Sequence, residues 1–224
     1  GAQDIYLTGN PQITFFKVVY RRHTNFSMES IEQTWSGNFK KTAGDATCTI
    51  SRNGDLIMGM HFDILFKMGS TKSGMQWTND VGNAYFEKCE LEIGGQTIDT
   101  HDCWFNNIHS HLFDWTSGGL SGLLHETEYR SATNSQFQAG VSINTQVYVP
   151  LKFWFCRNPG LALPLIALQY HEVKLKVRTR DVNDLLVKQS ADANAVLSSF
   201  STTLDPDVKL FVDYVYLDTD ERRR

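Results

Sequence analysis

The sequence of 224 residues has no long apolar run, and none of its apolar stretches approaches the ~18 residues that a membrane-spanning helix needs. It also has no excess of positive charge, because 21 lysine and arginine residues are outnumbered by 25 aspartate and glutamate residues, which gives a formal net charge of −4 at pH 7. A coat that binds its genome directly needs a basic face or arm, so this charge argues against direct nucleic-acid contact. The adjacent arginines at 21–22 and 222–224 are more typical of a solvated edge than of a phosphate-binding track.

Paired cysteines are missing as well. Cys48, Cys89, Cys103 and Cys156 are scattered and include no C-x-x-C pair. Cys48 and Cys89 fall on the apolar phase of strand-like alternation, which predicts buried free thiols. A reducing compartment fits this interpretation, and disulfides stay open because the sequence gives no distances between sulfur atoms.

Catalytic motifs are absent too, since the sequence has neither G-x-S-x-G nor a phosphate-binding G-x-x-x-x-G-K-[ST] loop. His109 and His111, with His101 and His125 nearby, raise the alternative of a cupin-type metal site. The apolar residues around them have helical spacing, and side chains two apart on a helix do not share a face. No glutamate follows at the short interval that a cupin needs. We therefore expect no catalytic residue, no metal, no cofactor and no enzymatic activity.

What the sequence does contain is the alternation of apolar and polar residues that is typical of half-buried strands. Every second residue from Leu56 to Phe66 is apolar, and Val173, Leu175 and Val177 alternate with basic residues. Similar patterns recur at about eight places, and strands do not alternate with helices, which predicts an all-β antiparallel sandwich. A chain of this length can build its core without disulfide or metal cross-links. Core packing is the expected role of most aromatic residues.

One segment, 102–115, departs from alternation. Trp104, Ile108, Leu112 and Trp115 recur at helical spacing, and Asp102 is a plausible N-cap, so a short helix is predicted. The polar, glycine- and serine-bearing segments 68–86, 115–142 and 181–206 predict long outer loops, and 1–11 predicts an irregular arm. Asp218, Asp220 and Glu221, beside the terminal arginines, predict an exposed ion-pair network.

Three turns are expected to shape the sandwich. Asn53 and Gly54 stand between two alternating runs, the strongest short-range signal for a β-hairpin, and Gly94 with Gly95 predicts a second tight turn. Asn158, Pro159 and Gly160 predict a third, in which Pro159 fixes φ and Gly160 permits a left-handed backbone. Pro164 interrupts the apolar run that follows, which indicates an edge strand or an extended loop. Asn25 opens the sequence's N-x-[ST] triplet and is a weak glycosylation candidate.

Several long strings, spread over nearly the whole chain, resemble one family. They are residues 1–16, 158–177 and 217–222, together with Ser51-Arg52-Asn53-Gly54-Asp55-Leu56-Ile57 and Leu91-Glu92-Ile93-Gly94-Gly95-Gln96-Thr97-Ile98-Asp99. In this order they are similar to the major capsid proteins of large icosahedral nucleocytoplasmic double-stranded DNA viruses. The segments between these strings show little of the resemblance.

The resemblance implies an eight-stranded jelly roll over residues 1–224, the first of two expected in tandem in a longer chain. It implies a homotrimer with a pseudo-hexagonal outline that tiles an icosahedral shell and contacts other capsid proteins. It further implies a place in the virion after synthesis in the host cytoplasm, near an internal membrane that the chain does not span. The alternative from the residues is a carbohydrate-binding jelly roll, such as a lectin or fibre module.

Overall fold

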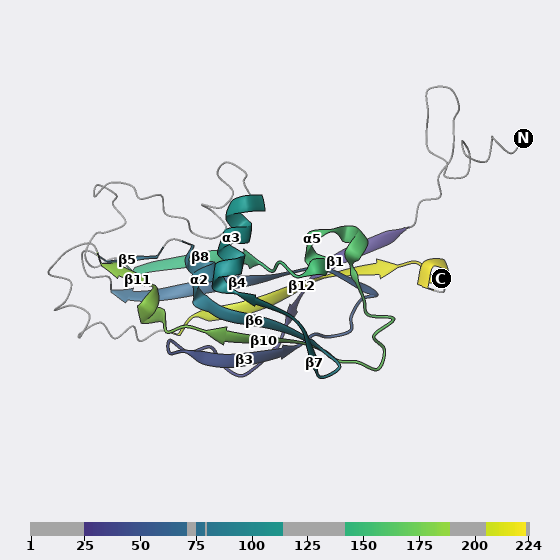
Figure 1. Cartoon of the computed structure of the whole chain (residues 1–224), viewed down its shortest axis with the longest axis horizontal. Helices are drawn as coiled ribbons and strands as arrows, with labels where there is room; N and C mark the ends of the chain where they lie inside the picture. The colour runs from purple at the N-terminus through teal and green to yellow at the C-terminus, as the bar shows by residue number, and fades with distance from the viewer. Residues whose placement is uncertain (1–24, 71–74, 79, 114–141, 189–204, 223–224) are drawn as a thin grey trace, which may run out of the picture.

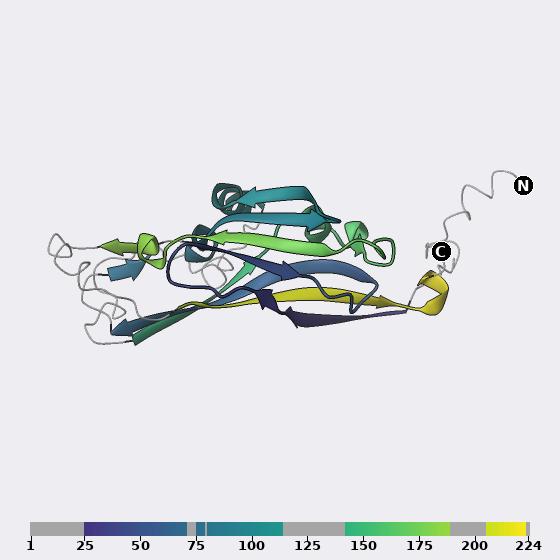
Figure 2. The ribbon, with the colours of Figure 1, turned by 90° about the horizontal axis from the view of Figure 1, so that it is seen from below.

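The computed structural model describes residues 25–70, 75–78, 80–113, 142–188 and 205–222, and these form two facing antiparallel sheets (Figures 1 and 2). In the first sheet the order is β1 (Phe26–Gln33), β12 (Asp207–Leu217), β4 (Leu56–Ser70) and β8 (Ser142–Pro150). In the second sheet the order is β2 (Trp35–Ser36), β3 (Gly44–Thr49), β10 (Val173–Thr179), β6 (Phe86–Ile93) and β7 (Gln96–Asp102). The two-residue strand β9 (Leu163–Pro164) pairs with the start of β4.

The strand order is that of a jelly roll. Without the short strands β2 and β9, each sheet has four strands, and the chain passes between the sheets by way of β1, β3, β4, β6, β7, β8, β10 and β12. β1 and β12, the first and last strands, are neighbours in the first sheet. This topology confirms the predicted all-β, eight-stranded jelly-roll sandwich.

The core lies between the inner faces of the two sheets, as the alternation predicts. Phe62 of β4 stacks on Phe86 of β6 with ring centroids 4.2 Å apart, and both side chains are fully buried. Each buried aromatic side chain of this kind contributes about 1.5–3 kcal/mol through removal of apolar area from water. The four cysteines are free, and burial raises the pKa of Cys48 to about 11 and that of Cys89 to about 12.

The alternation along β4 changes phase at Met58, which the sequence did not predict. Phe62, Ile64 and Phe66 face the core as expected, but Ile57 is buried and Leu56 and Met58 are only partly buried. The cause is a β-bulge: Gly59 pairs with Asp213 and Ile57 with Tyr214, so Met58 is an extra residue without a partner on β12. An extra residue reverses the face of every side chain before it.

The predicted outer loop at 68–86 is wrong for its second half. The segment contains β5 (Met75–Trp77) and the short helix α2 (Val81–Tyr85), and Trp77, Val81 and Tyr85 are buried in the core. Trp77, Val81 and Tyr85 therefore pack in the core, and this part of the segment is not a surface loop.

The predicted loop at 181–206 needs a similar correction at its start. Asp181 caps the 3-10 helix η3 (Val182–Leu185), which buries Val182 and Leu185, and the strand β11 (Leu186–Lys188) then pairs with β5. Residues 1–11 and 115–141, also predicted as arm and loop, lie outside the described residues.

Helices are few and short. The predicted helix is present as α3 (Cys103–Phe113), and the described residues add single-turn helices α5 (Trp154–Arg157) and α7 (Thr219–Arg222). Within the described part of the chain, no helix has the length and hydropathy to cross a membrane.

Candidate assembly surfaces

The 51–55 connection carries the chain from the second sheet to the first. It was predicted as a β-hairpin, and this prediction is wrong, because β3 pairs with β2 and β10 whereas β4 pairs with β12 and β8. Gly54 has no positive φ; it is required by a close approach instead, since a Cβ there would lie 2.8 Å from Cβ of Tyr214. The Asn-Gly signal therefore marks a turn between sheets.

Polar groups join this connection to both terminal strands. Gln33 at the end of β1 is buried, and its Oε1 accepts from the Ser51 amide (2.9 Å) and from the Ser51 hydroxyl (2.7 Å). Tyr214 of β12 donates its hydroxyl to the Ser51 carbonyl at 2.6 Å. Asn53 donates to Oγ of Ser51 at 3.0 Å. Each buried polar group of this network therefore has a partner, which such groups require.

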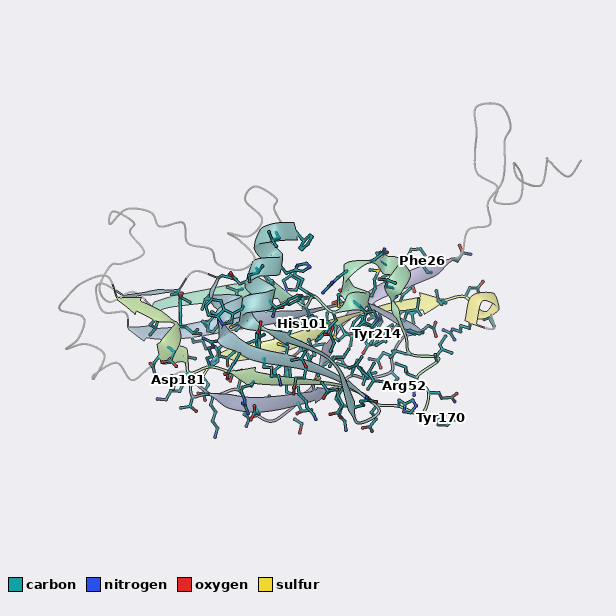
Figure 3. The ribbon with its side chains drawn as sticks, in the orientation of Figure 1. Phe26, Arg52, His101, Tyr170, Asp181 and Tyr214 are labelled. Atoms are coloured by element: carbon teal, nitrogen blue, oxygen red, sulfur yellow. The ribbon has the colours of Figure 1, made fainter. Side chains whose placement is uncertain are left out.

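Asp55 anchors the end of the last strand to the same connection. Its Oδ2 accepts from the Leu217 amide at 2.7 Å and from Nε of Arg222 at 2.9 Å, and its carboxylate is largely buried. Arg52 donates to the carbonyls of Leu165 and Gln169 and so ties the connection to the 165–170 turn. In Figure 3, Arg52 and Tyr214 lie in the half of the sandwich that is nearer to α7.

The other predicted turns differ from one another. Gly94 and Gly95 connect β6 to β7, and both have a positive φ, of 60° and 85°, which explains why glycine suits both places. Pro159 and Gly160 lie in the 3-10 helix η2 (Pro159–Leu161), and Oδ1 of Asn158 accepts from the Gly160 amide at 2.8 Å. Gly160 has no positive φ, so the left-handed conformation predicted for it is wrong. Pro164 lies in the edge strand β9.

Helix α3 starts where the sequence predicts. Oδ1 of Asp102 accepts from the Phe105 amide at 2.7 Å, which is the N-cap interaction with the third helical residue. No glycine or proline interrupts the eleven residues of α3. The helix stands off the edge of the sandwich formed by β7 and β8, as Figure 1 shows.

The apolar stripe of α3 faces solvent, contrary to the expected core packing of the aromatic residues. The residues of α3 that face the sandwich are small or polar: Cys103, Asn106 and Ser110 are buried. The larger apolar side chains are exposed, namely Trp104 (69%), Phe105 (37%), Ile108 (55%), Leu112 (67%) and Phe113 (72%). We call these five residues the α3 face. A stripe of this size on one short helix is typical of a protein–protein contact.

A ladder of aromatic rings connects the α3 face to the core. His101 of β7 stacks on Phe153, with ring centroids 4.6 Å apart, and meets Phe105 at a tilt, with centroids 4.5 Å apart. Phe105, His109 and Phe113 continue the row of rings along α3. Burial lowers the pKa of His101; the nearby Arg157 and His109 also lower it, whereas Asp99 opposes the shift. Burial therefore disfavours the charged imidazole, and Figure 3 shows His101 at the base of α3.

An open depression of about 590 Å³ lies beside this ladder, between α3, α5 and the strands β6, β7 and β10. Side chains of both charges line it: Lys88, Arg157, Arg178 and Arg180 with Glu87, Asp99 and Asp102. Arg157 donates to the Lys152 carbonyl and lies over the Phe105 ring, and Arg180 donates to Sγ of Cys103. The depression thus places the guanidinium groups of Arg157 and Arg180, together with carboxylates, next to the α3 face.

The opposite edge of the first sheet is formed by β1. Its residues Phe26 and Met28 are 61% and 57% exposed, although they are large and apolar. Glu29 and Glu32 are also exposed, and β1 contains no lysine or arginine. We call Phe26, Met28, Glu29 and Glu32 the β1 edge. Asn25, the glycosylation candidate, is exposed directly before it.

The histidines that were considered as a cupin-type metal site do not come from one element. His101 belongs to β7 and His109 to α3, while the side chain of His111 and residue 125 lie outside the described parts. Among the residues that the structure describes, no three histidine, cysteine, aspartate or glutamate side chains are arranged to hold a metal ion.

The topology defines a jelly roll, and its similarity to solved structures identifies it as a jelly roll of the viral capsid class. The chain is similar to the quasi-atomic model of the PBCV-1 virus capsid, with a TM-score of 0.72 and 36% identity over 94% of this chain and 47% of that chain. The Faustovirus major capsid protein has the same fold at 11% identity, with a TM-score of 0.69 over 100% of this chain and 59% of that chain.

Sequence relatives identify the family. Residues 14–218 match the family described as "Major capsid protein N-terminus". The chain is 48% identical to the major capsid protein of Pyramimonas orientalis virus over 100% of this chain and 52% of that protein. It is 43% identical to that of Paramecium bursaria Chlorella virus 1 over 100% of this chain and 47% of that protein. The chain belongs to the major capsid protein family of nucleocytoplasmic large DNA viruses, and it spans about half the length of these relatives.

Proposed function

We propose that the chain is a structural subunit of an icosahedral virus shell, in which its work is to hold shape and to bind neighbouring subunits. The observation that carries this proposal is a jelly roll whose core is closed by side chains while large apolar side chains remain exposed at two edges. A shell subunit needs both a rigid sandwich and surfaces for neighbours. The family comparisons favour this function over the carbohydrate-binding alternative.

The chain acts in this proposal as the first of two jelly rolls. The match to an N-terminal family description and the coverage of 52% of the Pyramimonas orientalis virus protein support a second unit of similar size. The anchored end of β12, held by Asp55, provides a firm base from which such a unit would continue. Three double units would make a trimer of pseudo-hexagonal outline that tiles the shell with itself and with other capsid proteins.

The subunit works without direct contact to the genome and without turnover of a substrate. A net charge of −4 supports separation from nucleic acid, which favours a basic surface. The finer expectations, an internal membrane beneath the shell and synthesis in the host cytoplasm, belong to the same proposal.

Electron microscopy of the complete polypeptide that contains this chain tests the proposal. We expect negatively stained particles with threefold symmetry and a hexagonal outline. Monomers at all concentrations, together with saturable binding on a glycan array, would instead support the carbohydrate-binding alternative.

A further inference from the structure

The 51–55 connection contains a chemically labile pair of residues, Asn53 followed by Gly54, and no second Asn-Gly pair occurs in the sequence. Asparagine is among the residues least resistant to chemical change over time. Its side-chain carbonyl carbon is open to attack by the main-chain nitrogen of the next residue. A glycine in that place leaves the approach uncrowded because it has no Cβ. Whether the pair reacts depends on how the fold holds both groups.

The fold leaves both reacting groups accessible. The side chain of Asn53 is exposed, and in the described structure its Nδ2 donates to the Ser51 hydroxyl at 3.0 Å. The main-chain N–H of Gly54 donates no hydrogen bond within the described part of the chain, and it precedes β4, which begins at Leu56. An exposed hydrogen bond between neutral groups adds little stability. Rotation of the Asn53 side chain toward the Gly54 nitrogen therefore costs little.

Two other exposed asparagines lack one of these conditions. Asn38 precedes Phe39, whose side chain crowds the attacking nitrogen. Asn158 precedes Pro159, whose main-chain nitrogen carries no hydrogen and so is not free to attack. Both side chains meet water as Asn53 does, so they are references that differ from it in the residue that follows.

We propose that Asn53 is a modification site at which the chain deamidates spontaneously, with water as its only co-reactant. The Gly54 nitrogen gives up its proton and forms a bond to Cγ of Asn53, the Cγ–Nδ2 bond breaks, and ammonia leaves with that proton. The product is a succinimide ring. Water then opens the ring at one of its two carbonyl carbons, which gives either aspartate or isoaspartate.

Isoaspartate changes the length of the connection. Its main chain runs through Cβ and Cγ, so one extra carbon atom lies between Ser51 and Asp55. The Ser51 carbonyl accepts from the Tyr214 hydroxyl at 2.6 Å, and Asp55 accepts from the Leu217 amide at 2.7 Å, so both contacts depend on this spacing. Either product also adds a negative charge close in the chain to the largely buried carboxylate of Asp55. The reaction therefore loosens the hold on the end of β12 as the protein ages.

Ageing of the whole chain in neutral buffer made with water enriched in heavy oxygen tests the reaction. Peptide mass spectrometry follows Asn53 together with Asn38 and Asn158 in the same sample, and the enzyme protein isoaspartate methyltransferase reports isoaspartate. The matched variant is Asn53→Gln, which keeps an exposed amide but needs a larger ring that forms more slowly. The result is independent of the capsid proposal, because it concerns a chemical change within a single chain.

Asn53 should convert at least about tenfold faster than Asn38, a difference of about 1.4 kcal/mol in the barrier, and Asn158 should stay unchanged. The rate should rise with pH, because the deprotonated nitrogen is the attacking species. Each converted chain should contain one heavy oxygen atom, and part of the product should be isoaspartate, which only the ring can give. Asn53→Gln should stay unconverted over the same period.

Hydrogen exchange at the Leu217 amide measures the structural consequence. Exchange should be about tenfold faster in chains that contain isoaspartate than in fresh chains, because the acceptor on Asp55 is displaced. The aged Asn53→Gln variant should exchange like the fresh parent chain.

Three results would overturn the inference. Conversion of Asn53 no faster than that of Asn38 would show that the fold keeps the two groups apart. Aspartate without any isoaspartate would rule out the ring. Unchanged exchange at Leu217 in fully converted chains would reject the loosening of β12.

Discussion

At the scale of single residues, the 51–55 connection shows how one close approach restricts a position to glycine. Gly54 lies against Tyr214, and the clash is with Cβ, which cannot rotate away as the end of a long side chain could. The ring of Tyr214 is held in place by its hydrogen bond to Ser51. Gly54 is thus required by packing rather than by backbone conformation.

Gly54→Ala should lower the free energy of unfolding by about 1–3 kcal/mol, the usual cost of overpacking a filled site. Urea denaturation measures this change. Gly44→Ala is the matched control, because a Cβ there would meet only the Thr42 carbonyl at 3.9 Å, and its effect should stay within about 0.5 kcal/mol. Equal stability of the two variants would contradict the close approach.

His101 gives the stability a dependence on pH. Burial lowers the pKa of the folded imidazole, so between that pKa and about 6.5, the usual value of an unfolded histidine, the unfolded chain binds more protons. The stabilising contribution is therefore complete above about pH 6.5 and is lost as the pH falls toward the folded pKa.

His101→Phe keeps an aromatic ring between Phe105 and Phe153 and removes the titration. The free energy of unfolding of the parent should decline from pH 7 to pH 5 more steeply than that of the variant, by no more than about 1.4 kcal/mol per pH unit. Parallel pH profiles, measured by urea denaturation in matched buffers, would show that His101 is not the group responsible.

At the scale of secondary-structure elements, Asp55 holds together the end of β12 and the last residue of α7, Arg222. Asp55→Ala would leave the Leu217 amide and the Arg222 guanidinium without this acceptor, at a cost of about 1–3 kcal/mol. Amide hydrogen exchange at Leu217 should become faster while exchange at the centre of β12 changes little.

Asp63→Ala is the control for this prediction, because Asp63 accepts only from the exposed Gln146 amide on β8 in the described structure. Its cost should remain below about 0.5 kcal/mol. Unchanged exchange at Leu217 in Asp55→Ala would show that other contacts hold the strand end.

The sequence predicted elements better than it predicted how they are joined. Alternation located β3, β4, β6 and β10, and helical spacing with Asp102 located α3, because both signals are local. The Asn53-Gly54 turn was assigned to a hairpin because local chemistry cannot tell a turn within a sheet from one between sheets. The bulge at Met58 depends on the pairing with β12, about 150 residues away along the chain, so β4 alone could not reveal it.

The α3 face shows a further limit of sequence reasoning. Apolar residues at helical spacing were expected to pack in the core, whereas the buried side of α3 consists of Cys103, Asn106 and Ser110. Periodicity identifies the apolar side of a helix but not whether that side meets the protein's own core or another molecule. The small residues on the opposite side were the available signal.

At the scale of the whole molecule, the fold is a rigid sandwich with one firmly anchored end and two dissimilar edges. The two edges lie across the sheets from each other, since β1 and β8 are the outer strands of the first sheet and α3 stands beside β7 and β8. Core packing provides stability, while the large apolar side chains of the α3 face and the β1 edge stay exposed and contribute little to it. This division suits a subunit that must keep its shape while it binds neighbours.

The most direct test of the proposed capsid function is an electron cryomicroscopy map of the virus shell that contains the complete polypeptide. The account predicts threefold capsomers with hexagonal outline, in which density for this two-sheet sandwich occupies alternate corners and α3 contacts an adjacent jelly roll. Shell density into which the sandwich does not fit, or capsomers without threefold symmetry, would contradict it.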